Sequence, residues 1–165
     1  MPQPSVPPLP PPPHMHGSRI RSRVLVASQF VLIALLAAPL AGLVPQGAMD
    51  LPGALCLLGS LVLVIAAFLA MRRRDFTVMP EPRPGSRLIE HGPYARIRHP
   101  MYTAVLLGGL GAALLHGGAV DGLLLVLLVC VMVTKLRHEE RLLQAAHPGY
   151  AAYRTRTAAL MPGVY

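Results

Sequence analysis

The chain has 165 residues, of which 53% are hydrophobic and only 13% are charged, and its formal net charge is +8. This composition excludes an ordinary soluble domain, in which about 25% of the residues are charged. All Lys and Arg residues fall into three clusters separated by long apolar stretches, at residues 19–23, 72–98 and 135–156. Basic clusters next to apolar stretches indicate membrane lipids, and not nucleic acid, as the partner of the positive charge.

Residues 1–18 form the first predicted segment, a Pro-rich tail. Prolines occupy eight of the first thirteen positions, a density that excludes helix and sheet and favours solvated polyproline conformations. The segment lacks the pattern of a signal peptide, because prolines stand where a charged leader would be. We expect a disordered cytoplasmic tail that acts as a spacer rather than as a ligand for an SH3-like domain.

Two uncharged apolar stretches follow, at residues 24–44 and 51–71. Each is long enough to cross a hydrocarbon core of about 30 Å at about 1.5 Å per residue, so each is predicted to be a transmembrane helix. Pro39 is expected to kink the first of them, a distortion that neighbouring helices accommodate in a membrane. Cys56 and Cys130 both lie in apolar spans and are interpreted as small hydrophobic residues, so no metal site is expected.

The loop between the second and third apolar stretches is rich in polar and aromatic residues, above all at residues 91–102. Pro100 stands where the next helix begins, a position that suits proline because its missing N–H has no helical partner. Arg98 and His99 are thereby placed at a helix N-terminus, which favours an anionic group. The residues alone equally allow a simpler interpretation, in which the arginines of this loop anchor the topology and its tyrosines belong to an aromatic belt.

The third and fourth predicted spans, residues 100–116 and 119–136, form a tight helical hairpin broken at Gly117-Gly118. The only charge of this region before Lys135 is Asp121, beside the break. Ala104, Gly108 and Ala112 recur every fourth residue, a spacing that lets two helix backbones approach closely, and we interpret them as ordinary packing.

A second polar cluster, residues 135–143, follows the last span directly. We expect the helix to continue out of the membrane and to end at residues 147–149, which read His-Pro-Gly. By charge alone, Glu139 and Glu140 are best interpreted as a solvated network with the arginines next to them.

These elements predict an all-α integral membrane protein with four transmembrane helices, the last two a tight hairpin, and a cytoplasmic C-terminal helical segment. Every basic cluster then lies on one side, while the opposite turns, residues 44–50 and 116–121, carry no Lys or Arg. Under the positive-inside rule, both termini are expected in the cytoplasm, and the membrane would be the inner (plasma) membrane in a bacterium. Residues 19–165 are expected to form a single membrane domain.

The two polar segments together resemble those of a known enzyme family. Gly92-Pro93-Tyr94 followed by Arg98-His99-Pro100-Met101-Tyr102 is similar to the G-P-Y-x-x-x-R-H-P-x-Y motif of the isoprenylcysteine carboxyl methyltransferase family and its phospholipid N-methyltransferase relatives. Glu139-Glu140, Leu143, Tyr150, Tyr153 and Pro162 resemble the E-E-x-x-L…Y-x-x-Y…P tail of the same family. The resemblance covers about residues 88–162 and does not include the first two spans.

The resemblance implies a cytosol-facing S-adenosylmethionine site within residues 88–162, with a lipophilic substrate that enters from the bilayer. It implies that Glu139 or Glu140 holds the amino group or the ribose hydroxyls of the cofactor, and that Arg98 and Arg154 orient an acidic substrate. The residues that would line the cofactor pocket are Tyr94, Arg98, His99, Pro100 and Tyr102.

The methyl acceptor is open at this point. An isoprenylcysteine-like carboxylate is favoured, while phospholipid amines, small thiols and other hydrophobic acids remain alternatives. A carboxylate needs no general base, whereas a thiol or an amine must lose a proton, for which His99 or a glutamate is available. Two other functions are weighed against the methyltransferase: an NADPH-dependent membrane reductase of the sterol-reductase type, and a non-catalytic membrane subunit. The oligomeric state is not predicted.

Overall fold

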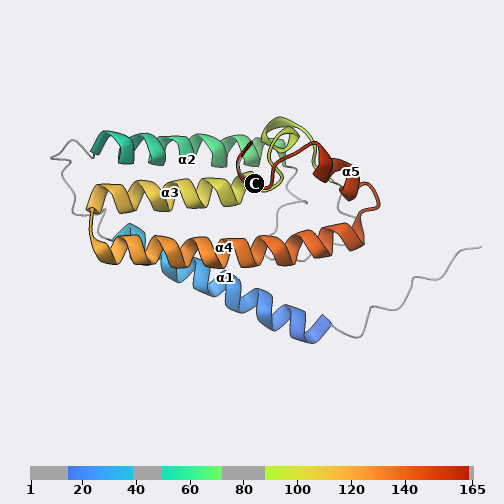
Figure 1. Cartoon of the computed structure of the whole chain (residues 1–165), viewed down its shortest axis with the longest axis horizontal. Helices are drawn as coiled ribbons and strands as arrows, with labels where there is room; N and C mark the ends of the chain where they lie inside the picture. The colour runs from blue at the N-terminus through green and yellow to red at the C-terminus, as the bar shows by residue number, and fades with distance from the viewer. Residues whose placement is uncertain (1–14, 39–49, 72–87, 164–165) are drawn as a thin grey trace, which may run out of the picture.

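The computed structural model describes residues 15–38, 50–71 and 88–163 (Figure 1). Within these residues the chain is helical and contains no β-strand apart from an isolated bridge between Ile97 and Ala158. The all-helical prediction is therefore confirmed for this part of the chain. The helices are α1 (Met15–Ala37), α2 (Asp50–Ala70), the short 3-10 helix η2 (Gly92–Ala95), α3 (Pro100–His116), α4 (Ala119–Ala146) and α5 (Tyr150–Thr155).

Among the described residues, three helices are long and apolar enough to cross a membrane: Ile20–Ala37 in α1, Leu51–Ala70 in α2, and α4. The fourth apolar helix, α3, has 17 residues. It is about 25 Å long, a little short of the roughly 30 Å hydrocarbon core. The predicted helix starts at 51, 100 and 119 agree with the observed ones to within one residue. That α3 is a fourth span stays a prediction.

Helix α1 begins earlier than predicted. The tail was expected to reach residue 18 and the first span to start near residue 24, whereas residues 15–18 already belong to α1. The prediction was wrong for these residues because proline blocks a helix only up to Pro13, after which no residue prevents one. Residues 1–14, Pro39 and the predicted end of the first span near residue 44 lie outside the described residues.

Helices α2 and α3 pack closely through glycines. A Cβ atom built on Gly53 would lie 2.7 Å from Leu115 Cγ, and one built on Gly111 would lie 2.8 Å from the Gly53 carbonyl oxygen. The Ser60 hydroxyl donates a hydrogen bond to the Ala104 carbonyl oxygen at 2.7 Å. Ala104 and Gly108 of the predicted row face Ser60 of α2, and Gly111 adds a close approach, while Ala112, expected in the same row, packs in the core with Leu36 and Leu128 instead.

The predicted hairpin between α3 and α4 is confirmed. Gly117 adopts the left-handed conformation (φ 70°) that ends a helix, and its N–H donates to the Ala113 carbonyl oxygen. His116 Nδ1 lies 3.0 Å from Asp121 Oδ1 across the turn. Helix α4 then runs for 28 residues, about 42 Å, so it is longer than a hydrocarbon core and continues through the second polar cluster as predicted.

The helices are arranged so that their basic ends meet. In Figure 1, the start of α1, the end of α2, the start of α3 and the end of α4 lie at the same end of the bundle, next to α5. Helix α1 packs against α4, with polar contacts that include Ser22 Oγ to His138 Nε2 at 3.4 Å. The polar chemistry of the described chain therefore gathers at this end.

Candidate functional site

The loop before α3 is held in place by the C-terminal segment. The Arg98 N–H donates to the Ala158 carbonyl oxygen at 2.8 Å, and the His99 N–H donates to that of Ala159 at 3.0 Å. In return, the Ala158 N–H donates to the Arg96 carbonyl oxygen at 3.0 Å. These backbone bonds fix the register of two segments about 60 positions apart in the chain, and so fix where the side chains of the loop point.

Arg98 connects this loop to both α4 and the C-terminal segment. Its Nε donates to Glu140 Oε1 at 2.7 Å, and one of its terminal nitrogens donates to the Arg154 carbonyl oxygen at 3.1 Å. The same nitrogen makes a short hydrogen bond to the Thr157 carbonyl oxygen. Both side chains of the ion pair with Glu140 are buried, so removal of either partner would leave an uncompensated charge away from water.

His99 lies between the two glutamates of α4. Its Nε2 is 3.6 Å from Glu140 Oε1, its Nδ1 is 3.9 Å from Glu139 Oε2, and its ring stacks on that of Tyr102. The expectation that the two distant polar segments meet is therefore confirmed. Nε2 is buried and has no hydrogen-bond partner within the described chain. Since Glu140 Oε1 is its nearest charged neighbour, Nε2 faces the carboxylate of α4.

Two phenols complete the surroundings of the glutamates. The Tyr102 hydroxyl donates a short hydrogen bond to Glu139 Oε2, and the Tyr150 hydroxyl donates to Glu140 Oε1 at 3.3 Å. Burial raises the pKa of Tyr150 well above its usual value. The Tyr150 phenol therefore stays a neutral donor to the carboxylate at physiological pH.

Helix α5 is fastened to the loop by Tyr153, whose hydroxyl donates to the Tyr94 carbonyl oxygen at 2.6 Å. Burial raises the pKa of Tyr153 to about 12, although the nearby Arg98 guanidinium acts in the opposite direction. Burial also raises the pKa of Tyr94 far above its ordinary value. Both side chains are thus neutral parts of the protein interior. The two sequence motifs that contain them serve first to assemble the site.

A cavity of about 310 Å³ opens among these residues. Most of the predicted cofactor-binding residues line it, namely Tyr94, Arg98, His99, Pro100, Tyr102 and Glu139. Glu140 lies behind this lining, where it holds Arg98 and His99. The Arg154 side chain is 53% exposed, is 4.0 Å from Glu140 Oε2, and does not line this cavity. The geometry therefore brings the predicted cofactor-binding residues together and leaves Arg154, predicted to orient the substrate, at the edge of the site.

The cavity also contains residues that were not predicted as site residues, above all Gln29 of α1 and Lys135 of α4. Lys135 Nζ donates to Gln29 Oε1 at 2.7 Å and lies 5.0 Å from the centre of the Tyr102 ring. The sequence carried one usable signal for them, which is a lone polar residue within an otherwise apolar stretch. The sequence could not show that Gln29 and Lys135 are partners, because nothing in it says that α1 packs on α4.

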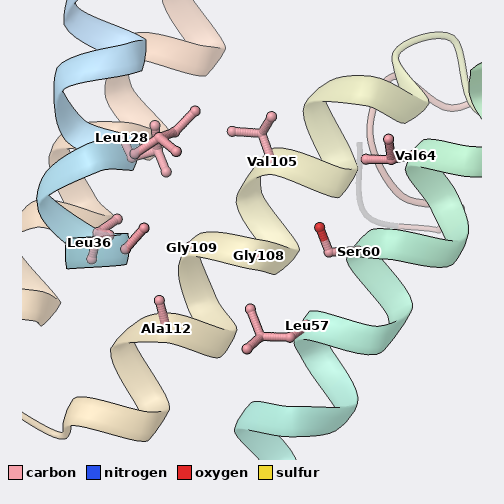
Figure 2. Close-up of a pocket in the computed structure, with 11 residues that line it drawn as sticks. Leu36, Leu57, Ser60, Val64, Val105, Gly108, Gly109, Ala112 and Leu128 are labelled. Carbon is pink, nitrogen blue, oxygen red and sulfur yellow. The ribbon is translucent and has the colours of Figure 1, made fainter. Parts of the chain in front are cut away.

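A second cavity, of about 270 Å³, lies next to the first, and Ile33 and Val105 line both. Its walls come from α1, α2, α3 and α4 and are apolar apart from Ser60, whose hydroxyl is already bonded to α3. Figure 2 shows α3 in the middle of this space, with Gly108 and Gly109 carrying no side chain. Residues of α1 and α4 lie on one side of α3, and residues of α2 lie on the other. We call this space the apolar chamber.

The chemistry of the first cavity suits an organic cation with polar groups. The carboxylate of Glu139 and the ring of Tyr102, which both line it, attract positive charge. Among the residues that the structure describes, no three His, Cys, Asp or Glu side chains are placed to hold a metal ion.

Comparison with known proteins gives two matches. The model of the phospholipid methyltransferase family matches residues 49–148, which include α2, α3, α4 and most of the first cavity. The cobalt-zinc-cadmium resistance protein CzcN of Cupriavidus metallidurans is 37% identical over 81 residues, which are 48% of this chain. The match spans only 38% of the length of CzcN. No solved structure matches the chain.

Proposed function

The chain belongs to the phospholipid methyltransferase family, which includes proteins similar to isoprenylcysteine carboxyl methyltransferases, and from this premise we propose an S-adenosylmethionine-dependent methyltransferase. It acts on a lipophilic acceptor at the cytoplasmic membrane face, with an isoprenylcysteine-like carboxylate as the favoured acceptor class. The observation that carries the proposal is one cavity whose lining brings the carboxylate of Glu139 together with the imidazole of His99 and the phenol of Tyr102.

The cavity residues fit the methyl donor chemically. When bound, S-adenosylmethionine supplies a methyl group on a positively charged sulfur, whose transfer to a carboxylate forms a C–O bond, breaks a C–S bond and neutralises both charges. Glu139 would hold the cationic amino group of the donor, and the rings of Tyr94 and Tyr102 would contact its positive charge or its base. The His99 ring would contact the donor or the acceptor where it lines the cavity.

The protein contributes position and a poorly hydrated environment. His99, Tyr102 and Lys135 are buried, so few water molecules compete with the reacting groups, and opposite charges that meet there are less stabilised than in water. Fixed alignment of donor and acceptor can supply several kcal/mol more. For a thiol or amine acceptor, His99 or Glu139, which both line the cavity, would take the proton.

The membrane orientation follows from the same proposal. Helices α1, α2 and α4 cross the membrane, α3 crosses it as the short partner of α4 in the hairpin, and both termini lie in the cytoplasm. The support is that the loop before α3, the start of α3 and the end of α4 lie at one end of the bundle (Figure 1), and that residues of these elements line the polar cavity. Cytoplasmic S-adenosylmethionine would then reach the cavity from water, and the acceptor would reach it from the bilayer.

Isothermal titration in detergent with S-adenosylmethionine and, separately, with NADPH tests the proposal. We expect saturable binding of S-adenosylmethionine alone, lost in His99→Ala. The matched control is His91→Ala, an exposed histidine in the same loop, which should bind as the wild type does. Binding of NADPH instead would favour a reductase, and binding of neither compound would favour a non-catalytic subunit.

A further inference from the structure

The Lys135 ammonium occupies the part of the first cavity that attracts positive charge. Its Nζ lies 5.0 Å from the centre of the Tyr102 ring, within the range of a cation–π interaction. Lys135 and Glu139 are four positions apart on α4, line the same cavity and interact electrostatically. The two features that suit the cavity to a cation, a phenol ring and a carboxylate, thus already act on a cation that belongs to the protein.

The Lys135 charge is held in this place. The side chain is 2% exposed, and Nζ donates to Gln29 Oε1 at 2.7 Å. The apolar chamber is a poor alternative for the ammonium, because its described walls are apolar apart from Ser60, whose hydroxyl is bonded to the Ala104 carbonyl oxygen. Lys135 is therefore a fixed positive charge in the cavity rather than a side chain that turns freely toward water.

The lining of the cavity has more positive than negative charge. Arg98, Lys135 and Glu139 line it, and Glu139 is the one carboxylate among the described lining residues. Glu140, behind the lining, compensates the charge of Arg98, which leaves Glu139 to act on Lys135. A donor whose sulfonium contacts the Tyr102 ring would meet the Lys135 ammonium there. Two like charges repel each other more strongly in a poorly hydrated space than in water.

We propose that Lys135 is a positioning residue whose positive charge opposes the sulfonium of the bound methyl donor. This inference rests on the proposed methyltransferase function and adds a residue to its machinery. In transfer to a carboxylate, an oxygen lone pair forms the new C–O bond, the C–S bond breaks with its electron pair left on the sulfur, and the sulfur becomes neutral. The repulsion by Lys135 is therefore present before transfer and is relieved as the positive charge leaves the sulfur, so it favours the transition state over the bound donor.

The first experiment compares S-adenosylmethionine with S-adenosylhomocysteine by isothermal titration in detergent, without an acceptor. The two ligands share their amino, carboxylate and adenosine groups, and only the first has a positively charged sulfur. We expect Lys135→Met to bind S-adenosylmethionine about tenfold more tightly than the wild type does, and to bind S-adenosylhomocysteine within about twofold of the wild type. Lys135→Arg keeps the charge and should behave as the wild type.

Arg137→Met is the matched control, because Arg137 is exposed on the same helix and does not line the cavity. Its loss of one positive charge should change neither affinity. Weaker binding of both ligands by Lys135→Met would assign Lys135 to their common carboxylate and overturn the inference, as would unchanged binding of both. Absence of S-adenosylmethionine binding in the wild type would instead contradict the proposed function.

Gln29→Glu tests the same point if Lys135→Met does not fold. A carboxylate at position 29 would lie beside the Lys135 ammonium and compensate its charge. This variant should also bind S-adenosylmethionine more tightly and leave the affinity for S-adenosylhomocysteine close to that of the wild type. An equal change for the two ligands would overturn the inference.

The second experiment measures methyl transfer at steady state to an acceptor that the wild type uses. Lys135→Met should lower the KM for S-adenosylmethionine and lower kcat, each by about tenfold, as expected when repulsion that is relieved in the transition state is removed. A residue with a purely structural role would lower kcat without tightening the donor. Either that result, or tighter donor binding with an unchanged kcat, would overturn the positioning role.

Discussion

At the residue scale, Glu140 organises the site without lining it. Its Oε1 accepts hydrogen bonds from Arg98 and Tyr150, and the same oxygen lies 3.6 Å from His99 Nε2. One carboxylate of α4 thus positions groups from the loop and from α5. Glu139, the neighbouring residue, faces the cavity instead, so the two consecutive glutamates have different tasks.

Glu140→Gln should destabilise the protein, because it leaves the buried Arg98 guanidinium without a counter-charge. We expect a loss of about 3 kcal/mol in unfolding free energy, measured by denaturation in detergent. The control is Glu90→Gln, which breaks the exposed ion pair with Arg156 and should cost no more than about 1 kcal/mol. Equal effects of the two substitutions would show that the buried ion pair contributes no more to the free energy of unfolding than the exposed one.

Tyr153 makes the stability depend on alkaline pH. Its pKa is raised from 10.0 to about 12 in the folded protein, so the folded state holds the proton more tightly than the unfolded state. The resulting stability is fully present below pH 10 and is lost as the pH rises toward 12. Tyr153→Phe should therefore show a shallower loss of unfolding temperature across this window, and an unchanged pH profile would contradict the assignment.

At the element scale, the start of α3 and its turn into α4 were predictable because proline and glycine determine them locally. Pro100 opens α3, and Gly117 ends it with a positive φ. The row of small residues on α3 was predicted less well, since helical periodicity does not say which neighbour each side chain meets. The side of α3 that faces α2 includes Gly111, and Ala112 packs in the core instead.

Gly111→Ala tests the contact between α2 and α3. The added methyl group would lie 2.8 Å from the Gly53 carbonyl oxygen, a backbone atom that cannot yield without moving a helix. We expect a destabilisation of about 1–3 kcal/mol in thermal or denaturant unfolding. Gly122→Ala, where a Cβ meets nothing within 4 Å, should instead be neutral or stabilising. Equal stability of the two variants would exclude close packing at Gly111.

At the scale of the whole molecule, the sequence predicted which polar segments meet but not everything that surrounds them. Charge distribution and the motif resemblance led to Arg98, His99, Glu139 and Glu140, and the structure brings these residues together. The contribution of α1 was missed, because the match of Gln29 with Lys135 depends on helix packing between residues more than a hundred positions apart. A lone polar residue in an apolar helix, such as Gln29, marks itself in the sequence, but nothing local identifies its partner on another helix.

The proposed orientation predicts where reporter domains appear. A reporter fused after Tyr165 should lie in the cytoplasm, and reporters inserted at Gln46 or Gly118 should lie outside, because all basic clusters flank the opposite ends of the helices. Protease accessibility or a compartment-specific reporter enzyme measures this directly. A cytoplasmic Gly118 would contradict a membrane-spanning hairpin of α3 and α4.

The most direct test of the central claim is transfer of a radiolabelled methyl group from S-adenosylmethionine to a panel of lipophilic acids, thiols and amines by the purified protein. We predict transfer to at least one acceptor by the wild type and a loss of about a hundredfold in kcat/KM in Glu139→Gln. Glu90→Gln, with the same chemical change outside the cavity, should retain the activity. Transfer to no acceptor, or an unchanged rate in Glu139→Gln, would contradict a methyltransferase site in this cavity.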